Sequence, residues 1–452
     1  MFYVLQMNTD LVQMNHLKTM FSITGIKGGK IMKRLFILLT AGILAASCEK
    51  AAESDNGIEL ISFRSSILTK TSLNGKQVLW SVNDTISVFA DSQNNPFTTE
   101  DNGSEAVFTG SATAGLDKYY AFYPYQKTST FEAGIVTFRL PIHQNSKINS
   151  FDEMTSPAFA VSESDVLEFS NVATMVKFTL AQDAGDIMAV ALVGGKGEYL
   201  SGRSTVDATA AVPVAVSSHC NEVRLSAGDG NLLEKGKEYC IVVAPTELKS
   251  GMTVKFIFSD YTSATLPVPG QITLTRNIPL NLGTIKPASA VNLVKNGDLE
   301  NGWTCWTKNE WNTNLDNSAS NESQIGSIIN GACHLRYSGG KNQWASVQQT
   351  VAVQAGSTYS FGFTGRAQTD TAAEGESAAH PTGGVTMTIL PTGNNNAKKA
   401  TSIKATNMNT SASGTITIPS GVSEVTVRIW KQVNHDTPCI TYADDIYFIK
   451  TE

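Results

Sequence analysis

Two strand-like segments near the C-terminus carry tryptophan among polar side chains, and these residues have the clearest capacity for chemistry. In segment 425–432 the odd-numbered positions are mostly apolar and must face a core, because successive side chains of a strand point to opposite faces. Arg428, Trp430 and Gln432 then share the outer face. An indole ring packs on the C–H face of a sugar, while guanidinium and amide groups bind its hydroxyls. The pattern indicates a candidate carbohydrate-binding face.

The same alternation in two earlier segments extends this candidate face. In 344–351 it leaves Trp344 and Gln348 outside, and in 359–366 it turns Arg366 outward. The alternative is that loops or a neighbouring domain cover either strand tryptophan. Three further tryptophans of a loop-rich stretch could be core lids or platform residues: Trp303, Trp306 and Trp311.

The segment 290–452 as a whole resembles carbohydrate-binding modules of the family-4-and-9 type. It opens on Asn-Leu-Val-Lys-Asn-Gly-Asp-Leu-Glu at 292–300, with leucine where the family usually has phenylalanine, and its later motifs follow in the family's order. The resemblance implies a β jelly-roll sandwich that binds a polysaccharide or other glycan. It also implies a structural calcium held by Glu300 and by Asp444 or Asp445, whose carboxylates are the hard ligands that calcium needs.

Residues 57–288 form short alternating segments separated by turns, a pattern typical of β-sandwiches. Trp-Ser-Val-Asn-Asp-Thr-Ile-Ser-Val-Phe at 80–89, the aromatic strand 119–125 and the closing segment 280–285 resemble the fimbrillin family of Bacteroidetes surface proteins. The resemblance implies two consecutive transthyretin-like β-sandwich subdomains that divide near 165–175. We expect Asp84 to cap a turn and four aromatic side chains to lie in cores: Trp80, Phe89, Phe108 and Phe122.

Residues 32–47 have the pattern of a signal peptide, with two basic residues before ten mostly apolar ones, too few to span a bilayer. Small residues then precede Cys48, as in the lipobox of bacterial lipoproteins. This resemblance implies cleavage before Cys48, diacylation of its thiol, a tether over 48–56 and lipid anchoring in the outer membrane at the cell surface. The alternative is an ordinary signal peptide with an incidental cysteine. Residues 1–31 are interpreted as a spurious or unstructured upstream extension, although a genuine extension remains an alternative.

Several function classes are disfavoured by composition and by absent motifs. A formal charge of -6 with only 16% charged residues, and no basic patch, gives no reason to expect a nucleic-acid partner. The six histidines are scattered, and no hydrolase or phosphate-loop motif occurs. Glu163 and Asp165 sit in a polar serine-rich segment that favours a solvated loop over a glycosidase pair. We therefore expect no enzyme.

The cysteines allow more than one interpretation. Cys220 and Cys240 could form a disulfide or remain buried free thiols. Cys305, Cys333 and Cys439 are an odd number, so at least one stays free or pairs elsewhere.

The leading hypothesis is a non-catalytic cell-surface lipoprotein that binds glycan through residues 290–452, with 57–288 as a spacer. The alternative is a pilus-type structural subunit of the fimbrillin family with fimbrial or surface-complex partners. An appended C-terminal module would obstruct assembly at a stalk position, so the only position in a pilus that suits this chain is that of a tip adhesin. A third possibility is that the jelly roll binds a protein or packs on its neighbour.

Overall fold

The computed structural model describes the following residues: 57–67, 79–195, 197–228, 230–311, 313–317, 333–337, 343–369, 384–404, 406–433 and 439–451. They form β-strands with single-turn 3-10 helices such as η1 (Glu153–Thr155) and η3 (Asn395–Ala397), which confirms the all-β class. No helix in these ranges has the length and apolar character needed to cross a bilayer. The predicted signal peptide, Cys48 and the tether lie outside the described residues.

The first sheet closes into a seven-stranded ring. Closure is possible because β1 pairs in parallel with β10, which follows it by about a hundred residues. In spatial order the strands are β1 (Ile58–Ile67), β10 (Val166–Asn171), β9 (Ala158–Ser162), β5 (Tyr119–Tyr123), β2 (Thr85–Ala90), β3 (Gln93–Thr98) and β4 (Glu105–Thr113).

Aromatic side chains fill this barrel, as the sequence predicted. Trp80 lies edge-on to Phe108 and Phe169, with ring centroids 4.9 and 5.5 Å apart, an arrangement that aromatic quadrupoles favour. Phe89 and Phe122 are equally buried but pack in an adjoining cluster that includes residues of the following subdomain. All four predicted core positions are therefore confirmed.

Asp84 has the predicted turn-capping role. Its carboxylate accepts a hydrogen bond from the backbone N–H of Ser81 at 2.8 Å, and its own backbone N–H donates to the Ser81 carbonyl. The Tyr123 hydroxyl donates to the other carboxylate oxygen at 3.3 Å. These bonds explain why aspartate stands just before β2.

The second subdomain is built from four sheets. Three of them share one apolar core, and the sheet that contains β7 packs instead in the cluster that holds Phe89 and Phe122. Strands β7 and β8, although they precede residue 165, pair with β13 and β15 of this subdomain. The chain therefore crosses between the subdomains before the predicted division. The five-stranded sheet has the spatial order β19 (Ser263–Val268), β18 (Met252–Phe258), β12 (Ile187–Val193), β15 (Glu222–Ser226) and β8 (His143–Asn145). The four-stranded sheet has the order β14 (Ala215–Cys220), β13 (Ser201–Asp207), β7 (Ile135–Leu140) and β6 (Thr130–Glu132). The three-stranded sheet has the order β16 (Glu238–Val243), β11 (Thr174–Leu180) and β21 (Leu280–Ile285), and the two-stranded sheet pairs β17 (Thr246–Leu248) with β20 (Ile272–Leu274).

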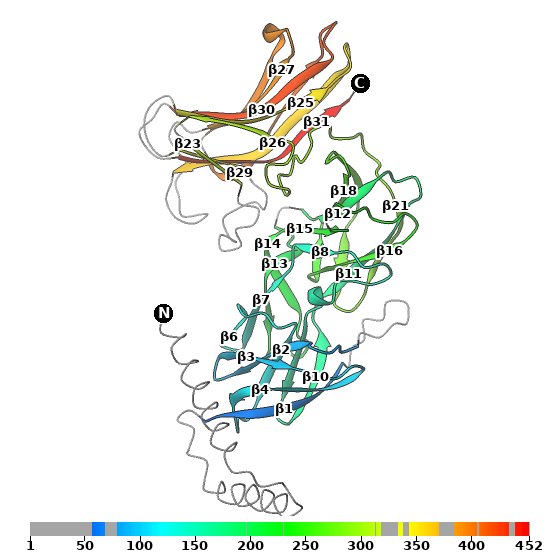
Figure 1. Ribbon diagram of the computed structural model, residues 1–452, viewed down its shortest axis with the longest axis vertical. Helices are drawn as coiled ribbons and strands as arrows, with labels where there is room; N and C mark the ends of the chain where they lie inside the picture. Colours follow the sequence, from blue (N-terminus) through cyan, green and yellow to red (C-terminus); the bar gives the residue numbers. More distant parts are fainter. Residues whose placement is uncertain are drawn as a thin grey trace, which may run out of the picture. The chain divides into compact units, whose positions relative to one another are not determined.

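The C-terminal module is a sandwich of two five-stranded antiparallel sheets, as the jelly-roll resemblance implied (Figure 1). Both sheets contribute side chains to a single core. One sheet has the order β22 (Thr307–Trp311), β25 (Gln343–Ala352), β30 (Glu424–Val433), β27 (Gly384–Pro391) and β28 (Lys399–Lys404). The other has the order β23 (Thr313–Asn317), β24 (Cys333–Tyr337), β31 (Cys439–Lys450), β26 (Thr358–Thr369) and β29 (Thr406–Thr417).

Cys220 and Cys240 are both buried and form no disulfide with each other, so the disulfide alternative is wrong for this pair. Burial raises the pKa of Cys220 to about 11 and that of Cys240 to about 12, which keeps both thiols protonated and unreactive at neutral pH. Cys305 is free and exposed. The side chains of Cys333 and Cys439 lie outside the described residues.

Candidate functional site

The alternation that motivated the candidate site is confirmed in β30. Val425, Val427 and Ile429 are buried in the core of the module, so the even-numbered positions face the other way. Directly opposite partners in an antiparallel sheet share a face, so the register extends this outer face to the neighbouring strands β22, β25, β27 and β28. We call it the tryptophan face; its described side chains are Thr307, Asn309, Ser346, Gln348, Thr350, Ala352, Thr386, Thr388, Leu390, Ala400, Ser402, Lys404, Glu424, Thr426, Arg428 and Trp430.

Trp430 lies on β30, and β30 is the central strand of the sheet (Figure 1). Its indole N–H donates a hydrogen bond to the Thr388 hydroxyl at 3.0 Å, which fixes the ring orientation. The Arg428 guanidinium carbon lies 5.9 Å from the Trp430 ring centroid, and Gln348 is the register partner of Arg428. Trp430, Arg428 and Gln348 are each half-buried. The structure therefore gathers an oriented aromatic ring, a cation and an amide in one place.

Two other predicted members of the face are placed by their backbones alone. Trp344 and Gln432 are register partners on β25 and β30, and Trp311 pairs with Trp344. The side chains of all three lie outside the described residues. Their assignment to a binding site stays a prediction.

Arg366 is not available to a ligand, so its predicted outward exposure is wrong. It is fully buried, and its guanidinium carbon lies 4.1 Å from the ring centroid of Tyr442, its register partner on β31. Stacking on a tyrosine offsets the cost of removing the guanidinium from water. Strand alternation predicts which face a side chain takes, but it cannot predict what covers that face.

Two loop tryptophans contribute to the core rather than to the face. Trp306 is buried, and its indole N–H donates to the Asn296 carbonyl at 2.9 Å. Trp303 packs partly buried against the same core. Leu299, the departure from the family motif, is fully buried there too, so it fills an equivalent apolar role.

The opening motif of the module is fastened to its closing strand. The Asn292 amide donates to the Ile446 carbonyl at 3.0 Å, and its oxygen accepts from the backbone N–H of Phe448 at 2.9 Å. Gly297 must be glycine, because a Cβ there would meet the Ile446 carbonyl oxygen at 2.2 Å. The two ends of residues 290–452 therefore hold each other, which explains why both carry recognisable motifs.

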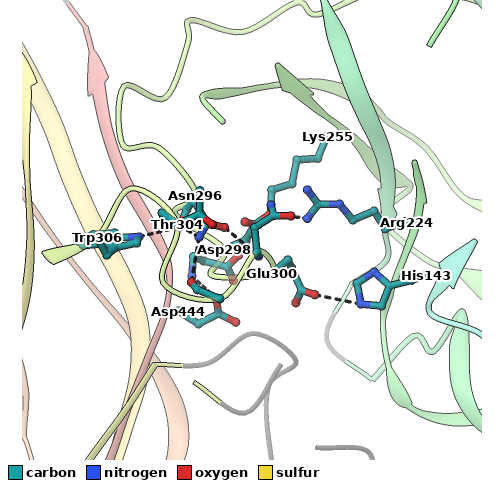
Figure 2. A network of polar contacts seen from close by, with 12 residues as sticks. His143, Arg224, Lys255, Asn296, Asp298, Glu300, Thr304, Trp306 and Asp444 are labelled. Carbon is teal, nitrogen blue, oxygen red and sulfur yellow. Dashed lines mark hydrogen bonds and ion pairs between the residues drawn. The ribbon is translucent and has the colours of Figure 1, made fainter. Parts of the chain in front are cut away.

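The acidic residues of the opening motif contact a basic row on the second subdomain (Figure 2). Asp298 Oδ2 lies 3.0 Å from Lys255 Nζ and 3.2 Å from Arg224 Nη1, and its side chain is only 9% exposed. Glu300 Oε2 lies 3.2 Å from His143 Nε2. We call these five residues the charge network. Asp298 and Arg224 are both buried, and each of the two charges is compensated by the other across this contact.

Electrostatic coupling within the charge network is strong. Burial opposes ionisation of Asp298, but Lys255 and Arg224 outweigh it and hold the pKa of Asp298 below its usual value. Burial would lower the pKa of Lys255, yet the nearby carboxylates raise it. Contact with Glu300 raises the pKa of His143. Asp298 and Lys255 are therefore both ionised at neutral pH, and their attraction stabilises the position of the opening motif.

Sequence reasoning missed the charge network, although the strand register explains it. His143 pairs with Arg224, Arg224 with Ala191, and Ala191 with Lys255, which forms one row across β8, β15, β12 and β18. Each of the two cations follows an apolar residue inside a buried strand. A lone charge in such a strand could have indicated a paired, covered surface.

The predicted calcium ligands are only partly brought together. Asp444 is buried, accepts the backbone N–H of Asp445 at 2.7 Å and makes no ion pair within the described ranges. Burial raises its pKa, and repulsion by Asp445 and Glu300 raises it further. A buried carboxylate among like charges suits a calcium ion, which would relieve that repulsion. Asp445 instead is largely exposed, 3.9 Å from Lys255. No three His, Cys, Asp or Glu side chains of the described part gather as a metal site, so Glu300 and Asp444 would need carbonyl or water oxygens to complete the shell.

The carbohydrate binding domain family matches residues 291–438, which cover most of the C-terminal module. No curated protein matches the chain at a significant level. The match therefore relates the C-terminal module, and not the whole chain, to a family of carbohydrate binding domains.

Solved structures with similarity include carbohydrate-binding modules and proposed cell adhesion proteins. The chain is similar to the carbohydrate-binding module TmCBM61 in complex with β-1,4-galactotriose, with 14% identity over 35% of this chain and 99% of that chain and a TM-score of 0.26. It is also similar to a proposed cell adhesion protein of Bacteroides ovatus, with 16% identity over 52% of this chain and 95% of that chain and a TM-score of 0.36. A proposed cell adhesion protein of Bacteroides uniformis gives 13% identity over 50% and 93% and a TM-score of 0.33.

Proposed function

We propose that this protein is a non-catalytic cell-surface lipoprotein that binds glycan through the tryptophan face, with residues 57–288 as a spacer. The observation that carries the proposal is Trp430, held by Thr388 beside Arg428 on the central strand of a sheet whose face is rich in hydroxyl and amide groups. The match of residues 291–438 to a carbohydrate binding domain family supports it. Glu163 and Asp165 lie in an exposed bend, and Glu163 pairs with Lys118 at 3.0 Å, which suits no glycosidase role.

The arrangement suits a sugar for physical reasons. A pyranose presents apolar C–H groups on its faces and hydroxyls around its edge, so it needs a ring to stack on and polar groups around that ring. Trp430 supplies the ring. Its indole N–H already donates to the Thr388 hydroxyl, so a sugar stacked on the ring leaves no indole donor without a partner. Gln348 and Arg428 supply donors and an acceptor at its border.

The proposal is tested by affinity electrophoresis of the purified protein through gels that each contain one polysaccharide. We expect at least one gel to retard the protein relative to a gel without polysaccharide. Migration that is unchanged in every gel of a broad panel, including acidic and neutral plant and animal polysaccharides, would contradict the proposed function.

Anchoring at Cys48 is a separate part of the proposal, and labelling of growing cells with a fatty acid tests it. We expect the label to be incorporated into the wild-type protein and lost from Cys48→Ser, because the thioether requires the thiol. Cys305→Ser removes an exposed free cysteine of the folded part and serves as the matched control, which we expect to stay labelled. Absence of label from the wild-type protein would show that the cysteine is incidental.

Calcium binding is proposed at Glu300 and Asp444, and thermal unfolding measures it. A cation that binds the folded state with a dissociation constant near 0.1 mM would add about 2 kcal/mol at 5 mM calcium. We expect a rise in melting temperature over that in EDTA. Asp444→Asn should lose the response and be at least as stable as wild type in EDTA, because the amide removes repulsion from Asp445 and Glu300. Equal melting temperatures of the wild type with calcium and with EDTA would exclude the site.

A further inference from the structure

The charge of Arg428 is not balanced on the tryptophan face. Its Nε is buried and has no hydrogen-bond partner, and its interaction with Trp430 is a ring contact at 5.9 Å. Within the described ranges no carboxylate forms an ion pair with it, whereas Arg224 and Lys255 both do so with Asp298. A half-buried guanidinium without a counter-charge is partly removed from water at a net cost. Such a guanidinium is suited to pair with an anionic group of a bound ligand.

The neighbouring positions on the face have the same electrostatic character. Arg428 is flanked by Gln348 on β25 and by Thr388 on β27, and the next row contains Ser346, Trp430 and Thr386. At the edge strand, Lys404 pairs with Gly384, two residues from Thr386 on the same side of β27, and is exposed. The described side chains around Arg428 therefore supply hydroxyls and an amide, and Lys404 adds a second cation at the edge strand. The acid among the described side chains of the face, Glu424, stands at the start of β30, four residues from Arg428, and forms no ion pair with it within the described ranges.

We propose that the tryptophan face selects an anionic polysaccharide, with a carboxylate or sulfate group of the sugar paired to Arg428 and the pyranose ring packed on Trp430. This inference rests on the proposed function and adds the substrate class. A neutral hydroxyl can accept a hydrogen bond from the guanidinium but leaves its charge uncompensated. A carboxylate or sulfate accepts two parallel hydrogen bonds from it and neutralises it. Lys404 adds a second, weaker attraction for the anionic groups of the same polysaccharide.

Matched polysaccharides that differ in charge alone test this inference by isothermal titration of the purified protein. Polygalacturonate against its full methyl ester tests the carboxylate source, and dextran sulfate against dextran tests the sulfate source. Since hydrogen bonds to charged groups contribute about 1.5–3 kcal/mol, we expect the charged member of at least one pair to bind about tenfold more tightly or better. The preference should shrink as salt is raised, because exposed charges are screened.

Three variants locate the effect. Arg428→Gln should reduce the ratio between charged and neutral members to about one, and Arg428→Lys should retain part of it, because lysine keeps the charge but loses the two-pronged geometry. Trp430→Ala should weaken both members equally. A purely non-specific attraction to polyanions would instead survive Trp430→Ala and would be removed by salt alone, and that result would overturn the inference.

Failure of the inference and failure of the proposed function give different results. Equal binding of charged and neutral members, abolished by Trp430→Ala, would overturn the anionic class and leave glycan binding intact. An unchanged ratio in Arg428→Gln would also overturn it. No binding of any polysaccharide in the panel would contradict both.

Discussion

Trp430→Ala reduces the affinity for the bound polysaccharide by about thirtyfold or more, a loss of about 2 kcal/mol in binding free energy. Aromatic side chains at the centre of a binding surface typically contribute at least that much. The variant removes the only ring of the described tryptophan face on which a sugar can stack, and it leaves the core residues Val427 and Ile429 untouched. Isothermal titration measures the affinity, and the melting temperature should stay close to that of wild type.

Two further variants make the Trp430 result specific. Trp430→Phe keeps a ring but loses the hydrogen bond to Thr388, so it should bind more weakly than wild type and more tightly than Trp430→Ala. Tyr199→Ala removes a partly exposed aromatic residue of the second subdomain and should leave the affinity unchanged. If Trp430→Ala binds as tightly as wild type, the tryptophan face is not the binding site.

Asp298→Asn lowers the free energy of unfolding by about 3 kcal/mol. Removal of one partner from a buried ion pair leaves the other charge without compensation, and here two cations, Arg224 and Lys255, lose their carboxylate. Chemical denaturation monitored by tryptophan fluorescence measures the change. Because Trp303 and Trp306 follow Asp298 closely, their emission reports on the module that the charge network holds.

The exposed pair between Asp183 and Lys286 provides the control for the charge network. Asp183→Asn removes the same charge at a site whose side chains are both more than half exposed, and surface pairs contribute little. We expect this variant to unfold like wild type. A double variant, Asp298→Leu with Lys255→Met, should recover part of the stability lost in Asp298→Asn, because apolar replacement of a buried pair is tolerated better than a lone charge. Wild-type stability of Asp298→Asn would show that the network contributes nothing.

The sequence predicted the strands well wherever apolar and polar residues alternate. The expected closing strand 280–285 is β21, and the inward parity of 425–429 is confirmed by the core positions of Val425, Val427 and Ile429. Parity depends on local geometry alone, because successive side chains of a strand must point to opposite faces. For the same reason the face that carries Trp430 and Arg428 could be predicted without a structure.

Features that depend on contacts between residues far apart in the chain could not be predicted. Arg366 was expected outside, but Tyr442, 76 positions later, covers it by stacking on its guanidinium. The barrel closes through the parallel pairing of β1 with β10. The sequence pattern of neither strand indicates which strand it pairs with. Asp298 was passed over because an isolated aspartate in a loop says nothing of the cations that surround it. Burial and ion pairing arise from tertiary structure, and local patterns do not encode them.

Hydroxyl-radical footprinting of the purified protein with its tightest-binding polysaccharide tests the central claim most directly, because it reports the exposure of individual side chains. We predict that oxidation of Trp430 falls when the polysaccharide is bound, while oxidation of Tyr199 stays the same. Equal oxidation of Trp430 in the free and the saturated protein would contradict binding at the tryptophan face.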